Sequence, residues 1–245
     1  MPIMDLPYFY IADITQPSTT LDEATSKHII QVLRKKKNDQ LILTNGRGDN
    51  CTVVITDDHR KHCTVTVLSK NTTHQSTPKI CIAISLLKNT SRFEWFLEKA
   101  TEMGVQEIMP LICERTNKDK YRIDRFQNVL VSAMLQSKQS WLPSLHVPIS
   151  FNDALEMGFA VKMIAHCLPA NKPGLRNLSM NNSGDQIILI GPEGDFTEKE
   201  IELALVKKFQ PVSLGNTRLR TETAGIVAAA LLTANVFDHQ PDPEF

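Results

Sequence analysis

The sequence predicts an α/β protein in two parts, a small β-rich N-terminal domain over residues 1–72 and a larger α/β domain over residues 73–245. Three observations support this. Short runs rich in Val, Ile and Thr fill the N-terminal part, a polar segment follows, and continuous apolar runs then alternate with helical patterns. Continuous apolar runs are typical of strands buried on both faces, and their alternation with helices indicates a mostly parallel sheet.

The N-terminal domain is expected to hold one helix over Asp22–Arg34, where apolar residues repeat at helical spacing. Asn45-Gly46 favours a tight reversal after a strand. Ser69–Pro78 is polar and ends in proline, so we expect it to link the two domains. The expected strands, chosen for their β-branched and aromatic residues, are Tyr8–Ile11, Gln40–Thr44, Cys51–Ile55 and Cys63–Leu68.

The C-terminal domain is expected to alternate strands and helices to the end of the chain. The expected strands are Ile80–Leu87, Glu107–Cys113, Val161–His166, Gln186–Ile190 and Val212–Leu214. The expected helices are Ser91–Met103, Asp124–Gln136, Thr197–Lys208 and Thr221–Phe237. Gly104 is placed to stop the first helix, and Thr197 with Glu200 forms a capping box at the start of the third.

Composition limits the class of protein. With 42% hydrophobic residues among 245, the chain can bury a packed core. Its 27 basic and 27 acidic residues balance, which argues against a protein that merely coats nucleic acid, although an enzyme acting on RNA can concentrate charge locally. Five cysteines without a C-x-x-C pair indicate reduced thiols in the cytoplasm and no metal site. No apolar run is long enough to span a membrane.

Three loops follow expected strands, at the sheet edge where ligands of open α/β sheets bind. They are Cys167–Pro169, Gly191–Phe196 and Leu214–Ala224.

The second of these loops suits a ligand but also suits a plain turn. Gly191 and Gly194 let the backbone approach a ligand, Pro192 stiffens the turn, and Glu193 places a carboxylate near a cationic group. A strand-to-helix turn that uses glycine only for its geometry explains the pattern equally well.

The third loop is more informative, because Arg218, Arg220 and Glu222 crowd the entry to an Ala-rich helix. A solvated charge run is the ordinary explanation, but the apolar flanks favour a cleft edge. His166 ends a strand beside this cleft and is expected to be structural. The sequence lacks G-x-G-x-x-G and P-loop motifs, which disfavours dinucleotide and nucleoside-triphosphate binding, and it lacks G-x-S-x-G and H-E-x-x-H.

These segments resemble the SPOUT-class methyltransferases that modify N3 of a uridine in 16S ribosomal RNA, over nearly the whole chain. Phe93–Arg115 resembles the family's helix–strand unit, and Ile188–Ala204 and Val212–Ala230 resemble the two loops that shape its cofactor pocket. Lys27–Asp39 and Thr44–Gly48 resemble its N-terminal RNA-binding domain, a PUA-like barrel.

The resemblance implies a deep trefoil knot in the C-terminal domain, S-adenosylmethionine held there in a bent form, and a homodimer acting on 16S ribosomal RNA of the small subunit. It also implies that the cofactor is held largely by backbone groups. The implied cofactor-binding residues are Leu168, Gly191, Pro192, Glu193, Gly194, Leu214, Gly215, Leu219, Arg220 and Thr223.

Arg220 is the expected catalytic side chain, stabilising negative charge on the uracil ring, with Glu193 as a weaker candidate that orients Arg220 or accepts a proton. The alternative for Arg220 is an ion pair with Glu222 or Glu193 that only orders the loop. Lys138 stands near the place where relatives commonly carry an arginine. RNA contacts are expected from Arg34, Lys35, Lys36, Arg47, Arg92 and Lys138.

Two other functions stay open from the sequence. One is an RNA-binding protein whose α/β domain has lost catalysis, although intact Gly191–Gly194 and Arg220–Thr223 argue against it. The other is a related methyltransferase acting on a ribose 2′-hydroxyl or on a tRNA base, which the motifs do not exclude.

Overall fold

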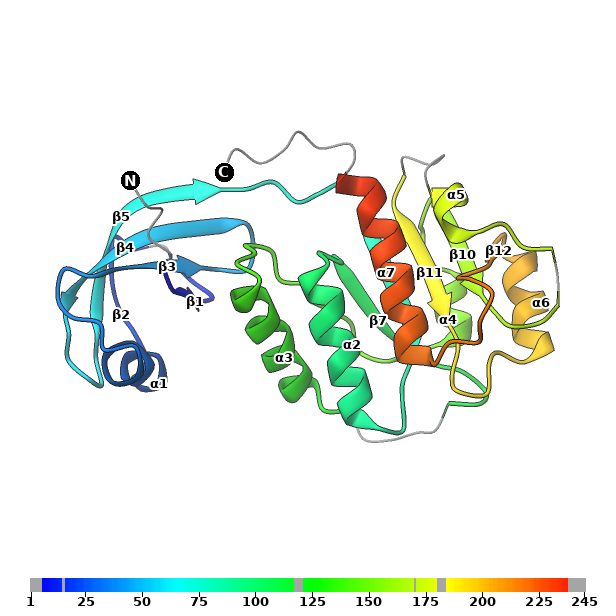
Figure 1. Ribbon diagram of the computed structural model, residues 1–245, viewed down its shortest axis with the longest axis horizontal. Helices are drawn as coiled ribbons and strands as arrows, with labels where there is room; N and C mark the ends of the chain where they lie inside the picture. Colours follow the sequence, from blue (N-terminus) through cyan, green and yellow to red (C-terminus); the bar gives the residue numbers. More distant parts are fainter. Residues whose placement is uncertain (1–5, 15, 117–120, 170, 180–183, 238–245) are drawn as a thin grey trace. The chain divides into compact units, whose positions relative to one another are not determined.

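The structure, a computed structural model, describes residues 6–14, 16–116, 121–169, 171–179 and 184–237. Its residues group into two compact units (Figure 1). The first runs to Gln75 and also holds Met134–Leu142, and the second holds Ser76–Ala133 and the chain from Pro143 onward. The chain first passes from the first unit to the second after Gln75, three residues beyond the predicted domain boundary at residue 72. The domain limits of 1–72 and 73–245 stay a prediction.

The first unit is built on a five-stranded sheet in the order β1-β3-β4-β5-β2. β1 pairs with β3 in parallel, and the other neighbours are antiparallel. Leu41, Leu43, Val53 and Ile55 alternate along two of the strands and are fully buried, which forms the core of this unit. The strands are β1 (Tyr8–Tyr10), β2 (Ser18–Thr20), β3 (Gln40–Thr44), β4 (Asp49–Asp57) and β5 (Thr64–Thr72).

The predicted linker is wrong over its first four residues, because β5 continues to Thr72. Polar residues can extend this strand because its end is exposed and its side chains bond across to β4. Lys70 Nζ lies 2.9 Å from a carboxylate oxygen of Asp49, and Thr72 Oγ1 donates to the same carboxylate at 2.7 Å. Polar pairs between β4 and β5 thus stabilise the end of this strand. It lacks the alternation of apolar and polar residues by which a strand is predicted from sequence.

The predicted helix over Asp22–Arg34 is present but changes type. Only α1 (Glu23–Lys27) is α-helical, with the Asp22 carboxylate capping its first turn, and His28–Val32 forms a π-helix. The Leu33 N–H donates to the carbonyl of His28, five residues back, at 3.0 Å. The spacing of apolar residues in the sequence predicts a helix here but does not distinguish a π-helix from an α-helix.

The second unit contains a seven-stranded sheet in the order β12-β10-β11-β6-β7-β8, with β9 also paired to β7. Every one of these pairings is parallel, which confirms the predicted mostly parallel sheet. The strands are β6 (Ile80–Ser85), β7 (Glu107–Ile112), β8 (Ser144–Leu145), β9 (Ile149–Ser150), β10 (Val161–Ala165), β11 (Gln186–Ile190) and β12 (Gln210–Val212). The last strand lies two residues earlier than predicted, which leaves Leu214 in the following loop.

Helices cover both faces of this sheet. α7 packs against α2 and α5 and over β6 and β11, while α4 and α6 close the other face with Phe196 and Phe209 (Figure 1). The helices are α2 (Thr90–Glu102), α3 (Ile123–Gln136), α4 (Phe151–Leu155), α5 (Leu175–Ser179), α6 (Glu198–Val206) and α7 (Thr221–Phe237). The capping box of Thr197 and Glu200 is confirmed. The helices in the described parts of the chain all lack the length or the apolar character that a membrane span needs.

Gly225 lets α7 approach α2 and the sheet closely. A Cβ atom at this position would lie 2.7 Å from the ring of Phe96 and 2.8 Å from Cδ1 of Ile84, and both of those side chains are fully buried. Neither can move without displacing its own neighbours, since protein cores are close-packed. The glycine therefore sets the distance of α7 from the sheet, and with it the place where the third loop enters the helix.

We predict that Gly225→Ala destabilises the protein by about 1–2 kcal/mol. Contacts below 3 Å with two buried side chains should cost the upper part of the usual range for overpacking, about 1–3 kcal/mol, and the gain in helix propensity offsets about 1 kcal/mol of it. Urea unfolding followed by circular dichroism measures this. Gly158→Ala is the matched control, because its Cβ would meet nothing within 4 Å. Equal stability of the two variants would contradict this account of the α7 contact.

Candidate functional site

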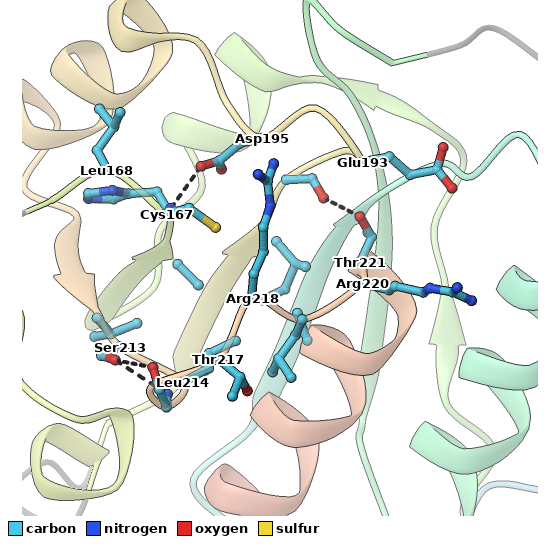
Figure 2. Close-up of a pocket in the computed structure, with 18 of the residues that line it drawn as sticks. Cys167, Leu168, Glu193, Asp195, Ser213, Leu214, Thr217, Arg218, Arg220 and Thr221 are labelled. Atoms are coloured by element: carbon cyan, nitrogen blue, oxygen red, sulfur yellow. Dashed lines mark hydrogen bonds between the residues drawn. The ribbon is translucent and has the colours of Figure 1, made fainter.

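Three strands of the second unit end level with one another. Ala165, the last residue of β10, pairs with Ile190 of β11 and with Val212 of β12. The loops that follow them therefore start side by side at the carboxyl edge of the sheet, as predicted. Between the loops lies a cavity of about 840 Å³ (Figure 2), a size typical of small-molecule sites.

The cavity is lined by most of the residues that the sequence assigned to a cofactor. These are Leu168, Gly191, Pro192, Glu193, Leu214, Gly215, Leu219 and Arg220. Sequence reasoning left other lining residues unassigned, among them Arg218, which it had noted only as part of a charge run. The unassigned polar ones are His166, Cys167, Lys172, Asp195, Ser213, Asn216, Thr217, Arg218 and Thr221.

Gly191 begins the second loop in a crowded position. A Cβ atom there would lie 3.0 Å from the Phe196 ring and 3.1 Å from the Phe196 nitrogen, so only glycine fits without a shift. Its carbonyl accepts a hydrogen bond from Thr221 Oγ1 at 3.0 Å, which joins the second loop to the start of α7 (Figure 2). Glycine here shapes the strand end as well as the cavity wall.

Gly194 and Thr223 are not among the residues that line the cavity, and their assignment to the cofactor stays a prediction. The carbonyl of Gly194 faces Arg115, whose Nη1 donates to it at 2.7 Å, so this peptide group is used to fix the loop. Thr221 and Ala224 lie one helical turn apart and face the cavity, and a helix turns Thr223 to another side.

The third loop leaves β12 through Gly215, whose φ of +138° excludes other residues without strain. Ser213 Oγ donates to the carbonyl of Gly215 at 3.1 Å and accepts its N–H at 3.3 Å (Figure 2). Leu214 and Leu219 flank this turn and are partly buried. The loop thus offers apolar side chains and backbone groups to a ligand.

The first loop is held by two charged side chains. The N–H of Cys167 donates to Oδ2 of Asp195 at 2.7 Å, and Lys172 Nζ donates to the carbonyl of Leu168 at 2.9 Å. Lys172 also donates to the carbonyl of His166 and lies 3.4 Å from its Nδ1. Burial, and then the charge of Lys172, lower the pKa of His166 below its usual 6.5, so its ring is neutral at pH 7.

Arg92, on the first turn of α2, pairs with Glu193 and Glu222, the two carboxylates that the sequence suggested as partners of Arg220. Arg92 Nη1 lies 3.0 Å from Glu193 Oε1, and Arg92 Nε lies 3.7 Å from Glu222 Oε1. Glu222 is only 5% exposed, and its Oε2 has no hydrogen-bond partner in the described structure. The alternative in which Arg220 pairs with Glu222 or Glu193 is therefore wrong for this structure.

Arg220 makes no ion pair with any residue that the structure describes, although it lines the cavity. Its side chain points away from the end where Asp195 lies, on the side of Glu193 (Figure 2). Arg218 extends in the other direction, toward the end of Asp195 (Figure 2). The cavity therefore has a guanidinium group at each of two sides.

Most of the predicted RNA-binding residues belong to the first unit, whereas the residues that line the cavity belong to the second. Arg34, Lys35, Lys36, Arg47 and Lys138 belong to this unit, and only Arg92 belongs to the second. Arg47 stands between two glycines of positive φ and donates from Nη2 to the carbonyl of Ala12 at 2.7 Å. Arg34 and Lys36 are exposed in the turn after the π-helix.

Family comparisons match both parts of the chain. Residues 74–233 match the family model described as an RNA methyltransferase domain, and residues 21–68 match the model described as an RNA methyltransferase PUA domain. The first match includes all three loops around the cavity.

Individual relatives agree with these matches. The chain is 34% identical to a ribosomal RNA small subunit methyltransferase E of Synechocystis sp. over 227 residues, 90% of this chain and 74% of that protein. A crystal structure of a probable rRNA methyltransferase from Porphyromonas gingivalis is 36% identical, with a TM-score of 0.88 over 96% of this chain and all of that one. A ribosomal RNA small subunit methyltransferase E from Neisseria gonorrhoeae, bound to S-adenosyl methionine, is 29% identical, with a TM-score of 0.84 over 94% and 97% of the two chains.

We predict that a thiol reagent labels one of the five cysteines in the folded protein. Cys51, Cys63, Cys81 and Cys113 are buried, and burial raises the pKa of Cys63 to about 11 and of Cys113 to about 12. Cys167 is exposed at the cavity wall. The loss of some surrounding water, and then the negative charge of Asp195, raise the pKa of its thiol, so it reacts slowly at pH 7 and faster as the pH rises.

Peptide mass spectrometry after iodoacetamide treatment identifies the labelled residue, and Cys167→Ser is the control that removes it. Rapid labelling of several cysteines in the native protein would contradict the buried positions of the other four.

Proposed function

The chain belongs to the RNA methyltransferase family that pairs this catalytic domain with a PUA domain, and from this we propose that it transfers a methyl group from S-adenosylmethionine to N3 of a uridine in 16S ribosomal RNA. One observation carries the proposal. The cavity lies at the carboxyl ends of three parallel strands, in a chain 29% identical to a cofactor-bound small subunit methyltransferase E over nearly its full length.

The cavity suits S-adenosylmethionine in its chemistry. Leu168, Leu214 and Leu219 offer apolar surface to the adenine, and the turns at Gly191 and Gly215 bring backbone groups within reach of polar atoms. We propose these five residues and Pro192 as the cofactor-binding set. Bound there, the cofactor supplies an electrophilic methyl group. A trefoil knot around the cavity, implied by the resemblance, stays a prediction.

Methyl transfer forms a bond from uracil N3 to the methyl carbon as the carbon–sulfur bond breaks, and the proton of N3 must leave. Alignment of the two reactants supplies on the order of 7–11 kcal/mol in such reactions, and a general base contributes about 10²–10⁴-fold. The chain therefore has two tasks, to hold the base in line and to accommodate the negative charge of the deprotonated ring.

We assign the second task to Arg220. Because Arg92 already pairs with Glu193 and Glu222, the guanidinium of Arg220 is left for a ligand. A planar guanidinium can donate to a uracil oxygen that gains negative charge, and it does so without reorganising water. Glu193 lies on the same side of the cavity (Figure 2), and we propose that it accepts the N3 proton. It pairs with Arg92 in this structure, so orienting Arg220, the other role expected for it, would need that pairing to change when the substrate binds.

Arg220→Ala is expected to lower kcat at least about 100-fold while the Kd for S-adenosylmethionine changes little, because charge stabilisation acts in the transition state. Arg220→Lys keeps the positive charge but not the planar guanidinium, so its kcat should lie between those of the wild type and of Arg220→Ala. Single-turnover methylation assays and calorimetry measure these quantities. Activity of Arg220→Ala close to that of the wild type would remove Arg220 from this role.

The proposed reaction itself is tested by its product. The purified protein, incubated with S-adenosylmethionine and small subunits from a strain that lacks the gene, should place one methyl group on the base of a uridine in 16S RNA. Nuclease digestion and mass spectrometry of the nucleosides identify 3-methyluridine. A methyl group on ribose, a methylated tRNA, or cofactor binding without any product would each support the rival functions instead.

We propose that RNA phosphates contact the first unit through Arg34, Lys35, Lys36, Arg47 and Lys138. The support is their exposure, or partial exposure for Lys35, within a unit that matches a PUA domain. Affinity for RNA should then fall steeply with salt, and a flat salt response would contradict this surface. Arg92 differs, because two carboxylates already pair with it, and we propose that it orders the cavity rim.

We further propose a cytoplasmic homodimer. Five free thiols suit a reducing compartment. α7 carries apolar residues on every side, with Ala230 and Ala234 exposed, which suits close packing against a second copy. Sedimentation equilibrium tests the dimer, and a monomer at micromolar concentration would contradict it.

A further inference from the structure

Asp195 adopts a backbone conformation that most residues avoid. Its φ is +64°, in the left-handed region, where only glycine is free of cost and Asp or Asn is tolerated. Its N–H donates to the carbonyl of Pro192 at 2.9 Å and closes the turn of the second loop. A residue held in such a conformation next to a cavity points to a function of its side chain.

The carboxylate of Asp195 joins two loops that follow different strands. Oδ2 accepts the N–H of Cys167 at 2.7 Å (Figure 2). Oδ1 accepts the N–H of Phe196 at 2.8 Å. Both are charge-assisted hydrogen bonds to backbone, which are among the stronger kinds. The carboxylate thus fixes the first loop, after β10, to the second loop, after β11.

Lys172 fixes the same turn through the carbonyl groups of its backbone. Its ammonium group donates to the carbonyls of His166 and Leu168 and lies beside the His166 ring. The backbone of residues 166–168 is therefore held by two side chains of opposite charge, in place of the hydrogen bonds that a regular element would supply. The lowered pKa of His166 keeps its ring neutral at pH 7, so the ring adds no charge of its own to this turn.

We propose that Asp195 and Lys172 are positioning residues that hold the turn of residues 166–168 ready as one wall of the cofactor site. This inference rests on the proposed function. In it, neither side chain takes part in methyl transfer, and their loss weakens the binding of S-adenosylmethionine because the turn must be ordered at the moment of binding.

Asp195→Asn and Asp195→Gly test the proposal without adding backbone strain, since both residues tolerate a positive φ. In Asp195→Asn the side-chain NH₂ group faces the backbone N–H of either Cys167 or Phe196, so one of the two hydrogen bonds is lost. In Asp195→Gly both carboxylate oxygens, and so both hydrogen bonds, are lost. We expect the Kd for S-adenosylmethionine to rise about tenfold in each. The KM for the cofactor should rise by a similar factor, while kcat at saturating cofactor stays within about twofold.

The matched control is Asp185→Asn. Asp185 Oδ1 accepts the N–H of Lys79 at 2.8 Å and so also joins distant segments, at the amino ends of β6 and β11 rather than at the cavity. Its loss should lower stability to a similar degree and leave the Kd within about twofold. Lys172→Arg, which keeps the charge and donors, should bind nearly as the wild type does, and Lys172→Met should bind weakly.

The outcomes separate this inference from the proposed function. If the wild type gives no calorimetric heat with S-adenosylmethionine, both fail. If the wild type binds and Asp195→Asn binds equally well, only the inference fails.

Hydrogen exchange on the wild-type protein without cofactor gives a measurement independent of any variant. The amide of Cys167 should be protected although it lies in an exposed loop, and fast exchange there would overturn the proposal.

Discussion

The shared register of β10, β11 and β12 is the constraint on which the site depends. Ala165 pairs with both Ile190 and Val212, so the three loops begin at one level and enclose a single cavity. A slip of one residue would draw Gly191 into the sheet and displace its loop by about 3.3 Å. Gly191 follows β11 directly and packs closely on Phe196, so the level of this strand end also sets the place of its loop.

Charged groups around the cavity divide into those used to build it and those left for a ligand. Arg92 holds two carboxylates at the rim, while Asp195 and Lys172 bond to backbone groups of the loops. Arg218 and Arg220 line the cavity and have no ion-pair partner among the described residues. The chain has no formal net charge, yet the groups left over at this edge are cationic, which suits an anionic substrate such as RNA.

Local patterns in the sequence identified the parts of the fold that they determine. Apolar runs located β6, β10 and β11, and the capping box located the start of α6, because burial and capping act within a few residues. The strands β2, β8 and β9 were missed, because at two or three polar or mixed residues each their pairing depends on distant partners. The end of β5 was missed for the related reason that its polar side chains bond to β4.

The residues of the site also divide into those with a local role, which the sequence identified, and those that act through distant partners, which it did not. Glycines at strand ends were found because their role is local, whereas Lys172 has no motif and acts only through folding of the loop around it. Asp195 carried a weak signal, an acidic residue after Gly194 in a turn that demands a positive φ. The partner of Glu193 was misassigned because Arg92 lies 101 residues away in the chain, and no spacing rule connects them.

A crystal structure of the protein with S-adenosylmethionine is the most direct test of the central claim, that three level strand ends create one backbone-lined cofactor site. The account predicts the cofactor between residues 166–168, 191–196 and 213–220, with its methyl group toward the side of Arg220 and Glu193, and with these turns unchanged. Cofactor bound elsewhere on the chain, or turns that collapse to fill the cavity with their own side chains, would contradict it.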